Sequence, residues 1–270
     1  NEDELRATGG FITGAGVVTV QGGQIIDLKF SDSSAVDNWL EKPYAFPPQP
    51  YFDFMNLELF GFRDANYWPD FRQSAQKAMD LYEYGHGDPP FDGAIAIDQE
   101  FLRLLVDATG PVPVPGTGQT ISANNLLETL RSARDIQEGQ DVAEWVSSRK
   151  DFLGGFAAAI QAKLEMDFSA IDPAKLLQNM TSAAEQRHLL IYMDDPELAG
   201  IMAANEWDGR IPEAPPGDFL MVVDTNMGYN KANAAIQRDL SYVVTPPAAP
   251  GERATAALTI NYTHPIDADD

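Results

Sequence analysis

The chain of 270 residues contains no cysteine, only three histidines, and 18 basic residues against 41 acidic ones. Without cysteine there can be no disulfide, no thiolate nucleophile and no cysteine-ligated zinc. The formal net charge of −23 gives a surface that repels polyphosphate, so we expect no nucleic-acid partner. No run of about 18 apolar residues occurs, so we expect no membrane-spanning helix.

The order of patterns along the chain predicts an α/β fold. The apolar fraction of 44% is enough for a sizeable core. Strands alternate with helices through the middle of the chain, which favours a layered α/β/α sandwich around a mixed β-sheet. We predict a single α/β domain over residues 1–270, with residues 218–270 as a β-rich extension packed on it.

Several local signals place the elements. The dipeptide Gly22-Gly23 predicts a hairpin between strands at Gly16–Val20 and Gln24–Phe30. Helix starts are predicted at Asp98, Ser122, Asp172-Pro173 and Asp195-Pro196. Further elements are expected as a helix at 74–84, a long helix at 142–164, and strands at 92–98, 188–192, 219–224, 240–245 and 256–262.

The common catalytic signatures are absent. The histidines His86, His188 and His264 are far apart and lack zinc-type spacing. No G-x-S-x-G sequence occurs, which excludes a hydrolase nucleophile elbow. The stretch Gly116–Thr120 lacks the G-K-[ST] ending of a phosphate loop, and the acidic pairs do not match a calcium loop.

Three stretches remain as candidate sites. In the first, Arg6 is followed by Thr8 and the pair Gly9-Gly10. A guanidinium fork and close-lying backbone N–H groups can bind an anion. A salt bridge from Arg6 beside a glycine turn explains the same residues equally well.

The second stretch, Arg63 to Phe71, mixes polar and aromatic side chains. Arg63, Asn66 and Asp70 alternate with Tyr67, Trp68 and Phe71. Aromatic faces that stack and polar groups that orient would suit a sugar or a lipid-phosphate headgroup. A small aromatic core is the alternative.

The third stretch, Asn226 to Asn233, is rich in asparagine. It contains Asn230, Lys231 and Asn233, and Arg238 follows it. Amides and cations after an apolar strand are typical of a strand-end site. Asparagine also favours turns for local reasons, so a structural role stays open.

These stretches, in this order, resemble the bacterial family catalogued as domain of unknown function 4012. The family's signatures are similar to E-L-R-x-T-G-G-F-I, R-D-A-N-W-x-P-D-F, D-G-x-I-A-I-D, T-G-P-V-x-V and V-V-D-x-N-x-G-x-N-K-x-N. They correspond here to Glu4–Ile12, Arg63–Phe71, Asp92–Asp98, Thr109–Val114 and Val222–Asn233. The resemblance implies an extracytoplasmic protein of the cell envelope, membrane-anchored in its full length and associated with polysaccharide. The anchor and a strand before the first signature would precede Asn1.

The middle of the chain is more distantly similar to the LytR-CpsA-Psr family, which transfers glycopolymers from polyprenyl pyrophosphate to the cell wall. The segment Val106–Val114 carries this similarity. The family's R-x-D-T motif would fall on Arg6–Gly9, with Thr8 in place of the metal-binding aspartate. Its arginine-bearing helices would fall near Arg131 and Arg134, and then near Arg149. A pyrophosphate site normally needs several arginines and a divalent cation, and several of those positions are not filled here.

Two functions follow as hypotheses. In the first, the domain binds a glycan or a polyprenyl-phosphate-linked carbohydrate with little or no catalysis. In the second, it is a phosphotransferase or pyrophosphatase with a reorganised site, in which Asp64 or Asp70 holds Mg²⁺ or acts as a base. The expected substrate-binding residues are Arg6, Thr8, Arg63, Asn66, Trp68, Arg134, Arg149, Asn230, Lys231, Asn233 and Arg238. The expected partner is an anionic lipid-linked glycan or polysaccharide, no metal-ligand set is assigned, and Mg²⁺ enters only with the second hypothesis.

Overall fold

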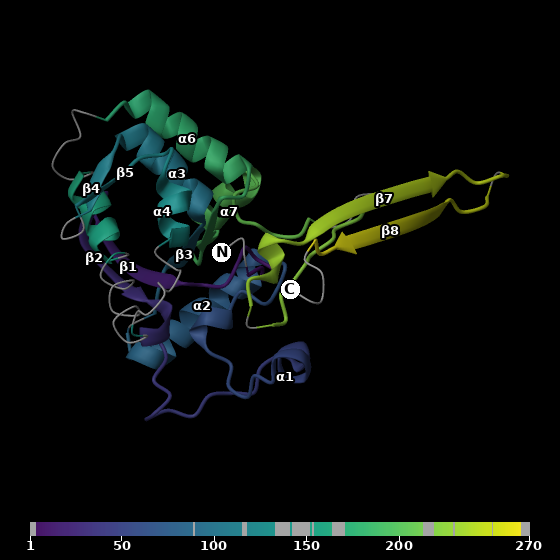
Figure 1. Ribbon diagram of the computed structural model, residues 1–270, viewed down its shortest axis with the longest axis horizontal. Coiled ribbons are helices and arrows are strands. Elements are labelled where there is room, and N and C mark those ends of the chain that lie inside the picture. The colour runs from purple at the N-terminus through teal and green to yellow at the C-terminus, as the bar shows by residue number, and fades with distance from the viewer. Residues whose placement is uncertain are drawn as a thin grey trace.

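Figure 1 shows the computed structural model of the chain, in which a rounded body carries a long two-stranded arm. The structure describes residues 4–88, 90–114, 118–132, 141, 152, 154–163, 171–212, 219–228, 230–249 and 251–265. Helices and strands both contribute to the body, so the α/β class predicted from the sequence is confirmed.

The sequence pattern predicted one mixed sheet between helical layers, and the described strands form a different arrangement. They make four two-stranded antiparallel sheets. The pairs are β1 (Gly14–Gln21) with β2 (Gln24–Asp32), β3 (Gly93–Ile97) with β6 (Leu189–Met193), β4 (Val112–Val114) with β5 (Gln119–Ile121), and β7 (Gln237–Thr245) with β8 (Thr255–Thr263). Three of the four join neighbours in sequence, because an antiparallel pair needs only a short turn. Alternation of strands and helices along the chain does not specify this pairing.

The β1–β2 hairpin forms as predicted. Gly22 and Gly23 turn the chain with φ of 60° and 79°, a conformation that glycine adopts without steric cost. The register shifts between Thr19 and Val20, which marks a bulge near the hairpin's outer end.

One face of the β3–β6 sheet packs on α2 (Phe71–His86). Phe71 and Ala75 of the helix and Leu190 of β6 are buried there, with Ala94, Ala96 and Tyr192 around them. At its other end α2 lies directly on backbone, since a Cβ at Gly85 would be 2.1 Å from the Val36 carbonyl oxygen. The helix that carries the Arg63–Phe71 loop is therefore fixed at both ends.

The predicted helix starts are largely confirmed. Asp98 caps α3 (Gln99–Thr109), Asp172 caps α6 (Pro173–Glu185) and Asp195 caps α7 (Pro196–Ala204), each by accepting a hydrogen bond from a backbone N–H. Gly110, with φ of 79°, ends α3. The helix expected after Ser122 is α4 (Leu126–Ser132). It begins later than predicted because Ser122 forms a turn with Asn125, whose side-chain oxygen accepts from the Ser122 N–H and hydroxyl.

Two apolar clusters make most of the described core. The first lies around α1 (Gln49–Met55) and the 3-10 turn η2 (Phe62–Asp64), and buries Val36, Tyr51, Met55, Phe60, Phe62, Ala65, Leu81 and Tyr82. The second joins α3, β4, β5 and α4 to Phe152 and Phe156. A long helix was predicted at 142–164. Residues 152 and 154–163 of it are described, and they are helical; the other positions of this range lie outside the described residues.

The segment 219–224 corrects one prediction. It was expected as a strand, and its described backbone belongs to no ladder. A run of apolar residues forms a strand only where another strand offers hydrogen bonds. No described strand pairs with this segment, which leads into the polar contacts described below. Among the described residues, none of the helices combines the length and the apolar composition that crossing a bilayer requires.

Candidate functional site

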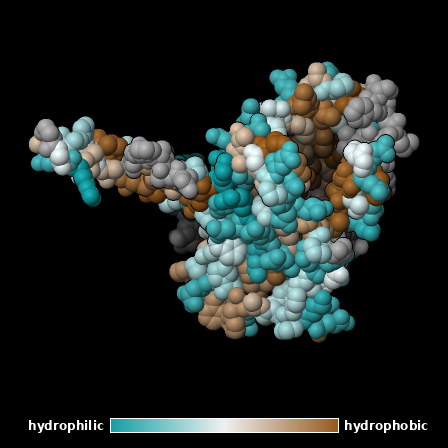
Figure 2. Space-filling view, turned by 180° about the vertical axis from the view of Figure 1, so that it is seen from behind, coloured by the Kyte–Doolittle hydropathy of each residue, from teal (hydrophilic) through white to brown (hydrophobic). Residues whose placement is uncertain are grey.

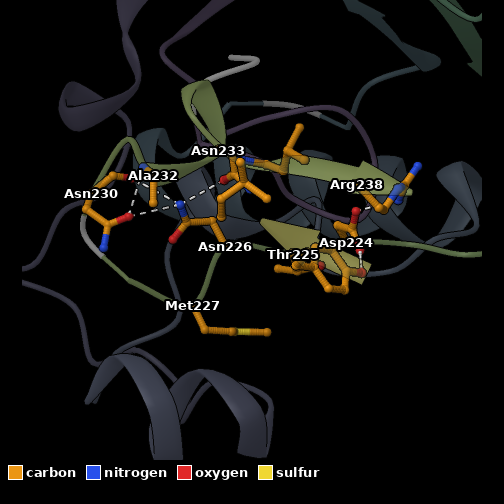
Figure 3. Close-up of a pocket in the computed structure, with 11 residues that line it drawn as sticks. Asp224, Thr225, Asn226, Met227, Asn230, Ala232, Asn233 and Arg238 are labelled. Atoms are coloured by element: carbon orange, nitrogen blue, oxygen red, sulfur yellow. Dashed lines mark hydrogen bonds and ion pairs between the residues drawn. The ribbon is translucent and has the colours of Figure 1, made fainter. Parts of the chain in front are cut away.

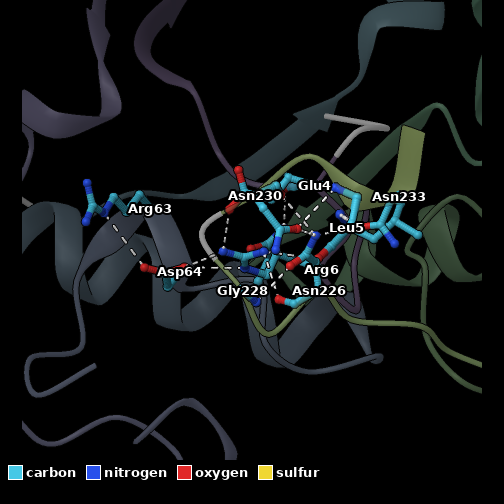
Figure 4. Close-up of polar contacts among 12 residues, drawn as sticks. Glu4, Leu5, Arg6, Arg63, Asp64, Asn226, Gly228, Asn230 and Asn233 are labelled. Atoms are coloured by element: carbon cyan, nitrogen blue, oxygen red, sulfur yellow. Dashed lines mark hydrogen bonds and ion pairs between the residues drawn. The ribbon is translucent and has the colours of Figure 1, made fainter. Parts of the chain in front are cut away.

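Arg6 lies at the centre of a set of polar contacts between distant parts of the chain (Figure 4). Its side chain is fully buried, and its guanidinium donates to Asp64 Oδ1 from Nη2 at 3.2 Å and from Nε at 3.4 Å. It also donates to Glu4 Oε1 at 3.0 Å and to the backbone oxygen of Asn226 at 3.2 Å. Such charge-assisted bonds satisfy a buried cation that would otherwise be very costly.

Asp64, the last residue of η2, is the carboxylate that faces Arg6. It is 2% exposed, and Arg63 approaches its other oxygen with Nε at 3.8 Å from Oδ2. Burial raises the pKa of Asp64, and the guanidinium groups of Arg6 and Arg63 oppose that rise. The half-buried Arg63 also lies over the Phe11 ring, 5.7 Å from its centroid.

Thr8 and Asn66 make a second connection between the same two segments. The Thr8 hydroxyl donates to the backbone oxygen of Trp68, and the Asn66 amide donates to the backbone oxygens of Thr8 and Gly10, both at 2.8 Å. The indole of Trp68 packs on the first core cluster and lies edge-on to Phe60. These residues hold the two loops together through backbone groups.

Three asparagines join the third segment to the first. Asn226 Nδ2 donates to Asn233 Oδ1 at 2.8 Å and to the side-chain and backbone oxygens of Asn230. Asn233 Oδ1 accepts in addition from the Leu5 N–H, and the Asn226 N–H donates to the Leu5 oxygen at 2.9 Å. We call the contacts among residues 4–12, 62–68 and 224–233 the junction.

Beside the junction the surface forms an open hollow of about 620 Å³ (Figure 3). Its polar lining comes from the asparagines, Thr225, Asp224 and Arg238, and Tyr262 of β8 and Ile236 add apolar surface. Asp224 accepts from Arg238 and, at 2.6 Å, from the Tyr262 hydroxyl. That hydrogen bond raises the pKa of Tyr262, so the hydroxyl keeps its proton.

Asp70 lies away from this hollow, at the start of α2. Its Oδ1 accepts from the Arg72 N–H as an N-cap, and its Oδ2 accepts from the Ile211 N–H at 3.3 Å. It lines a different hollow of about 480 Å³ between α2, β6 and α7. The structure thus places Asp64 in the junction and Asp70 in a helix cap, and does not join them in one carboxylate pair.

The structure brings together most of the candidate residues that were named from the sequence. Arg6, Thr8, Arg63, Asn66, Asn230 and Asn233 belong to the junction, Arg238 lines the hollow, and the exposed Lys231 precedes the short turn η4 (Ala232–Ala234). Arg134 and Arg149 lie outside the described residues.

The magnesium hypothesis meets an obstacle in the geometry. Both oxygens of Asp64 face guanidinium groups, which would repel a divalent cation and occupy the lone pairs it needs. Across the part of the chain that the structure describes, no group of three histidine or acidic side chains is arranged to hold a metal ion. The described residues around Asp64 therefore do not fit Mg²⁺.

Sequence reasoning missed Asp224 and Tyr262. Asp224 belongs to the V-V-D signature, where only the residues after it were singled out. Tyr262 reaches the site because the β7–β8 register places it opposite Arg238. The alternation of side chains along each strand indicates which residues of that strand share a face. Which residue of β8 lies opposite Arg238 can be known only from the paired strands.

Comparison with known families finds a match in the first half of the chain. Residues 1–134 match the model of the family described as "Protein of unknown function (DUF4012)". The chain belongs to the DUF4012 family. No curated protein and no solved structure matches the chain.

The match includes two of the three segments that make the junction. The family resemblance inferred from the signatures is therefore confirmed, and the more distant similarity to the LytR-CpsA-Psr family stays an expectation. The family's description assigns no function, so the site itself carries the functional evidence for this DUF4012 chain.

Proposed function

We propose that this chain is an extracytoplasmic, non-catalytic domain of the cell envelope that binds a glycan in the hollow beside the junction. The observation that supports the proposal is the lining of the hollow, where Asp224, Arg238 and Tyr262 are held together at the base of the arm and face the asparagines. This set supplies donors and acceptors with very little net charge.

Sugars are recognised by that combination of groups. A pyranose presents vicinal hydroxyls that pair with carboxylate, amide and guanidinium groups, and C–H faces that lie on an aromatic ring. In the hollow, Tyr262 offers an exposed ring and Asp224 and Arg238 offer paired polar atoms. The lining is held in place before any ligand arrives, because Asn226, Asn230 and Asn233 already bond to one another.

The distribution of cations favours the glycan over a pyrophosphate. Arg6 is buried against Asp64 and Glu4, and Arg238 is paired with Asp224, so these guanidinium groups are largely neutralised. The whole chain carries a formal charge of −23, which repels a multiply charged ligand. A neutral or weakly charged glycan, presented by a carrier or a polymer, needs no unpaired cation and is not repelled by the net charge.

The binding experiment uses saturation-transfer-difference NMR and calorimetry with a panel of neutral oligosaccharides containing glucose, galactose or N-acetylglucosamine. We expect binding to at least one of them. Arg238→Gln and Tyr262→Phe should each weaken it about two- to tenfold, as expected for one lost hydrogen bond. Tyr242→Phe is the matched control, since it removes a hydroxyl from the same strand pair at a position outside the hollow, and it should bind like the parent chain.

A parallel assay tests the phosphotransferase alternative. The chain is incubated with polyprenyl pyrophosphate and Mg²⁺, and phosphate release is measured. Turnover that Arg238→Gln abolishes would overturn the non-catalytic proposal, as would an absence of binding across the oligosaccharide panel. Labelling of an epitope tag at Ala248 in intact cells, where β7 and β8 are joined, tests the extracytoplasmic location, because a cytoplasmic tag would stay unlabelled.

A further inference from the structure

The arm has one apolar face that nothing described in the structure covers. The β7–β8 register places Leu240 opposite Ile260, Tyr242 opposite Leu258, and Val244 opposite Ala256. Directly paired residues point to the same side of a sheet, so these six side chains share a face. Leu240 is 48% exposed and Leu258 39% exposed. Figure 2 shows the apolar colour running along the arm as it leaves the body.

The opposite face of the arm is polar over most of its length. Its pairs are Gln237 with Thr263, Asp239 with Asn261, Ser241 with Thr259, Val243 with Ala257, and Thr245 with Thr255. An alternation of this kind is characteristic of a sheet with one face in water and one face packed. A two-stranded sheet on its own is marginally stable in water, so the apolar face requires a cover.

A second uncovered apolar face lies on the β1–β2 hairpin. One side of that hairpin packs Ala15 and Val17 against the first core cluster. The other side presents Val18, which pairs with Leu28, and Phe30, which pairs with Gly16. Phe30 lies flat over the strand because Gly14 and Gly16 leave room for it, and a Cβ on Gly14 would be 2.5 Å from its ring. Val18, Val20, Ile25 and Phe30 are all exposed.

The two faces match in length and in charge. The strands of the first hairpin have eight and nine residues, and those of the arm have nine each. From Leu240 to Thr245 and from Thr255 to Thr263 the arm has no charged residue. Asp27 and Lys29 of β2 pair with each other, and the register places them on the other side of the hairpin, the side of Val17. Figure 1 places the two hairpins at opposite ends of the molecule, so one chain cannot easily bring its own pair together.

We propose that the occupant is a second copy of this chain, in a two-fold dimer where each arm covers the partner's β1–β2 face. The area that each contact can bury favours this arrangement. A strand of nine residues is about 30 Å long and a two-stranded face about 10 Å wide, so one contact buries about 600 Å² over both surfaces. That is below what a specific interface needs, and two reciprocal contacts reach about 1,200 Å², the lower end of the standard range.

Net charge makes the salt dependence of this dimer diagnostic. Two copies of formal charge −23 repel each other, while the apolar pairs that meet carry no charge. The charged residues at the ends of the two faces are Arg238, which is paired with Asp224, and Asp32, which accepts from the Ser34 N–H. Added salt screens the repulsion and leaves apolar contact intact. The dimer therefore tightens as the salt concentration rises, whereas an association held by ion pairs would weaken.

Sedimentation of the full chain over a concentration series, at low and at high salt, measures the dimer. Leu240→Asp on the arm and Val18→Asp on the first hairpin should each raise the dissociation constant at least tenfold. Thr259→Asp adds the same charge to the polar face of the arm and should change the constant less than threefold. Far-UV circular dichroism of each variant checks that the hairpins remain folded, and Leu258→Asp replaces Leu240→Asp if the latter unfolds the arm.

A mixture of the two defective variants separates reciprocal exchange from other dimers. The Val18→Asp chain keeps an intact arm and the Leu240→Asp chain keeps an intact β1–β2 face, so a mixed dimer contains one undamaged contact. We expect the mixture to associate more tightly than either variant alone. A chain that stays monomeric at high concentration and high salt overturns the proposal. A dimer that is insensitive to Val18→Asp also overturns it, because it would show arm-on-arm packing.

Discussion

The junction and the arm differ in which kind of side chain they bury and which they expose. The junction buries polar groups, including the guanidinium of Arg6 and the carboxylate of Asp64, and satisfies them with one another. The arm exposes apolar groups, including Leu240 and Tyr262. A buried polar group needs a specific partner, and an exposed apolar face needs only something apolar to cover it. The first region is therefore completed within one chain, and the second is open to a partner.

The comparison between junction and hollow also shows that the residues of the family signatures have different roles. Residues that resemble an anion site by type, such as Arg6 with Thr8 and the glycines, are used to hold three segments together. The hollow in which we propose ligand binding begins where that network reaches the surface, at Asn230, Asn233 and Arg238. The junction positions the hollow, and the base of the arm forms its far wall through Tyr262.

Arg6→Met should have the largest effect on the junction. It removes the cation that Asp64 and Glu4 face, and leaves the buried Asp64 carboxylate without a hydrogen-bonded cation, since Arg63 lies 3.8 Å from its other oxygen. We expect a loss of about 3–5 kcal/mol in the free energy of unfolding, measured by urea denaturation followed by circular dichroism. Arg72→Met, at an exposed ion pair, is the control and should cost less than about 0.5 kcal/mol. Equal losses in the two variants would show that the junction is not a stabilising centre.

Asn66→Ala should weaken the junction to a smaller degree. It removes two hydrogen bonds to the backbone oxygens of Thr8 and Gly10 at a buried position. The expected loss is about 2 kcal/mol, since two acceptors lose their donor away from water. Asn205→Ala, which removes an exposed bond to the Ile201 oxygen, should cost less than half as much in the same titration.

Asp107→Asn tests an exposed ion pair, which is neither a buried polar contact like those of the junction nor an exposed apolar face like that of the arm. Hydrogen bonds from Lys175, and next from Asn179, lower the pKa of Asp107. A carboxyl with a lowered pKa in the folded state stabilises it above the pKa of the unfolded state, and that contribution is lost as pH falls through the folded-state pKa. The parent should exceed the variant by about 0.2–1 kcal/mol at neutral pH, and the two should converge in acid. A difference that grows on acidification would contradict this assignment.

Leu240→Ser should have the smallest effect, when it is measured at concentrations where the chain is monomeric. The side chain is already 48% exposed, so the unfolding free energy should change by less than about 0.5 kcal/mol. The matched substitution at a buried leucine, Leu126→Ser, removes apolar packing in the second cluster and should cost about 2–5 kcal/mol. A large loss from Leu240→Ser in the monomer would mean that the arm packs within its own chain.

Much of the fold could be predicted because its signals are local. The Gly22-Gly23 turn, the aspartate caps of α3, α6 and α7, and the Gly110 stop depend on a few neighbouring residues, and each appears where the sequence placed it. The mixed sheet and the strand at 219–224 depended on long-range pairing, and there the structure differs. Alternating patterns identify strands, and they do not say which strands pair.

The sequence by itself determined the family, the acidic surface, the local elements and the list of polar residues that matter. Only the tertiary structure decided what those residues do. It turned the Arg6 guanidinium inward against Asp64, gave Asp70 to a helix cap, and brought Tyr262 to the hollow from 38 positions beyond Asp224. A guanidinium can pair with a buried carboxylate as well as with a ligand, and which of these occurs depends on the groups that the folded chain places within about 3 Å of it.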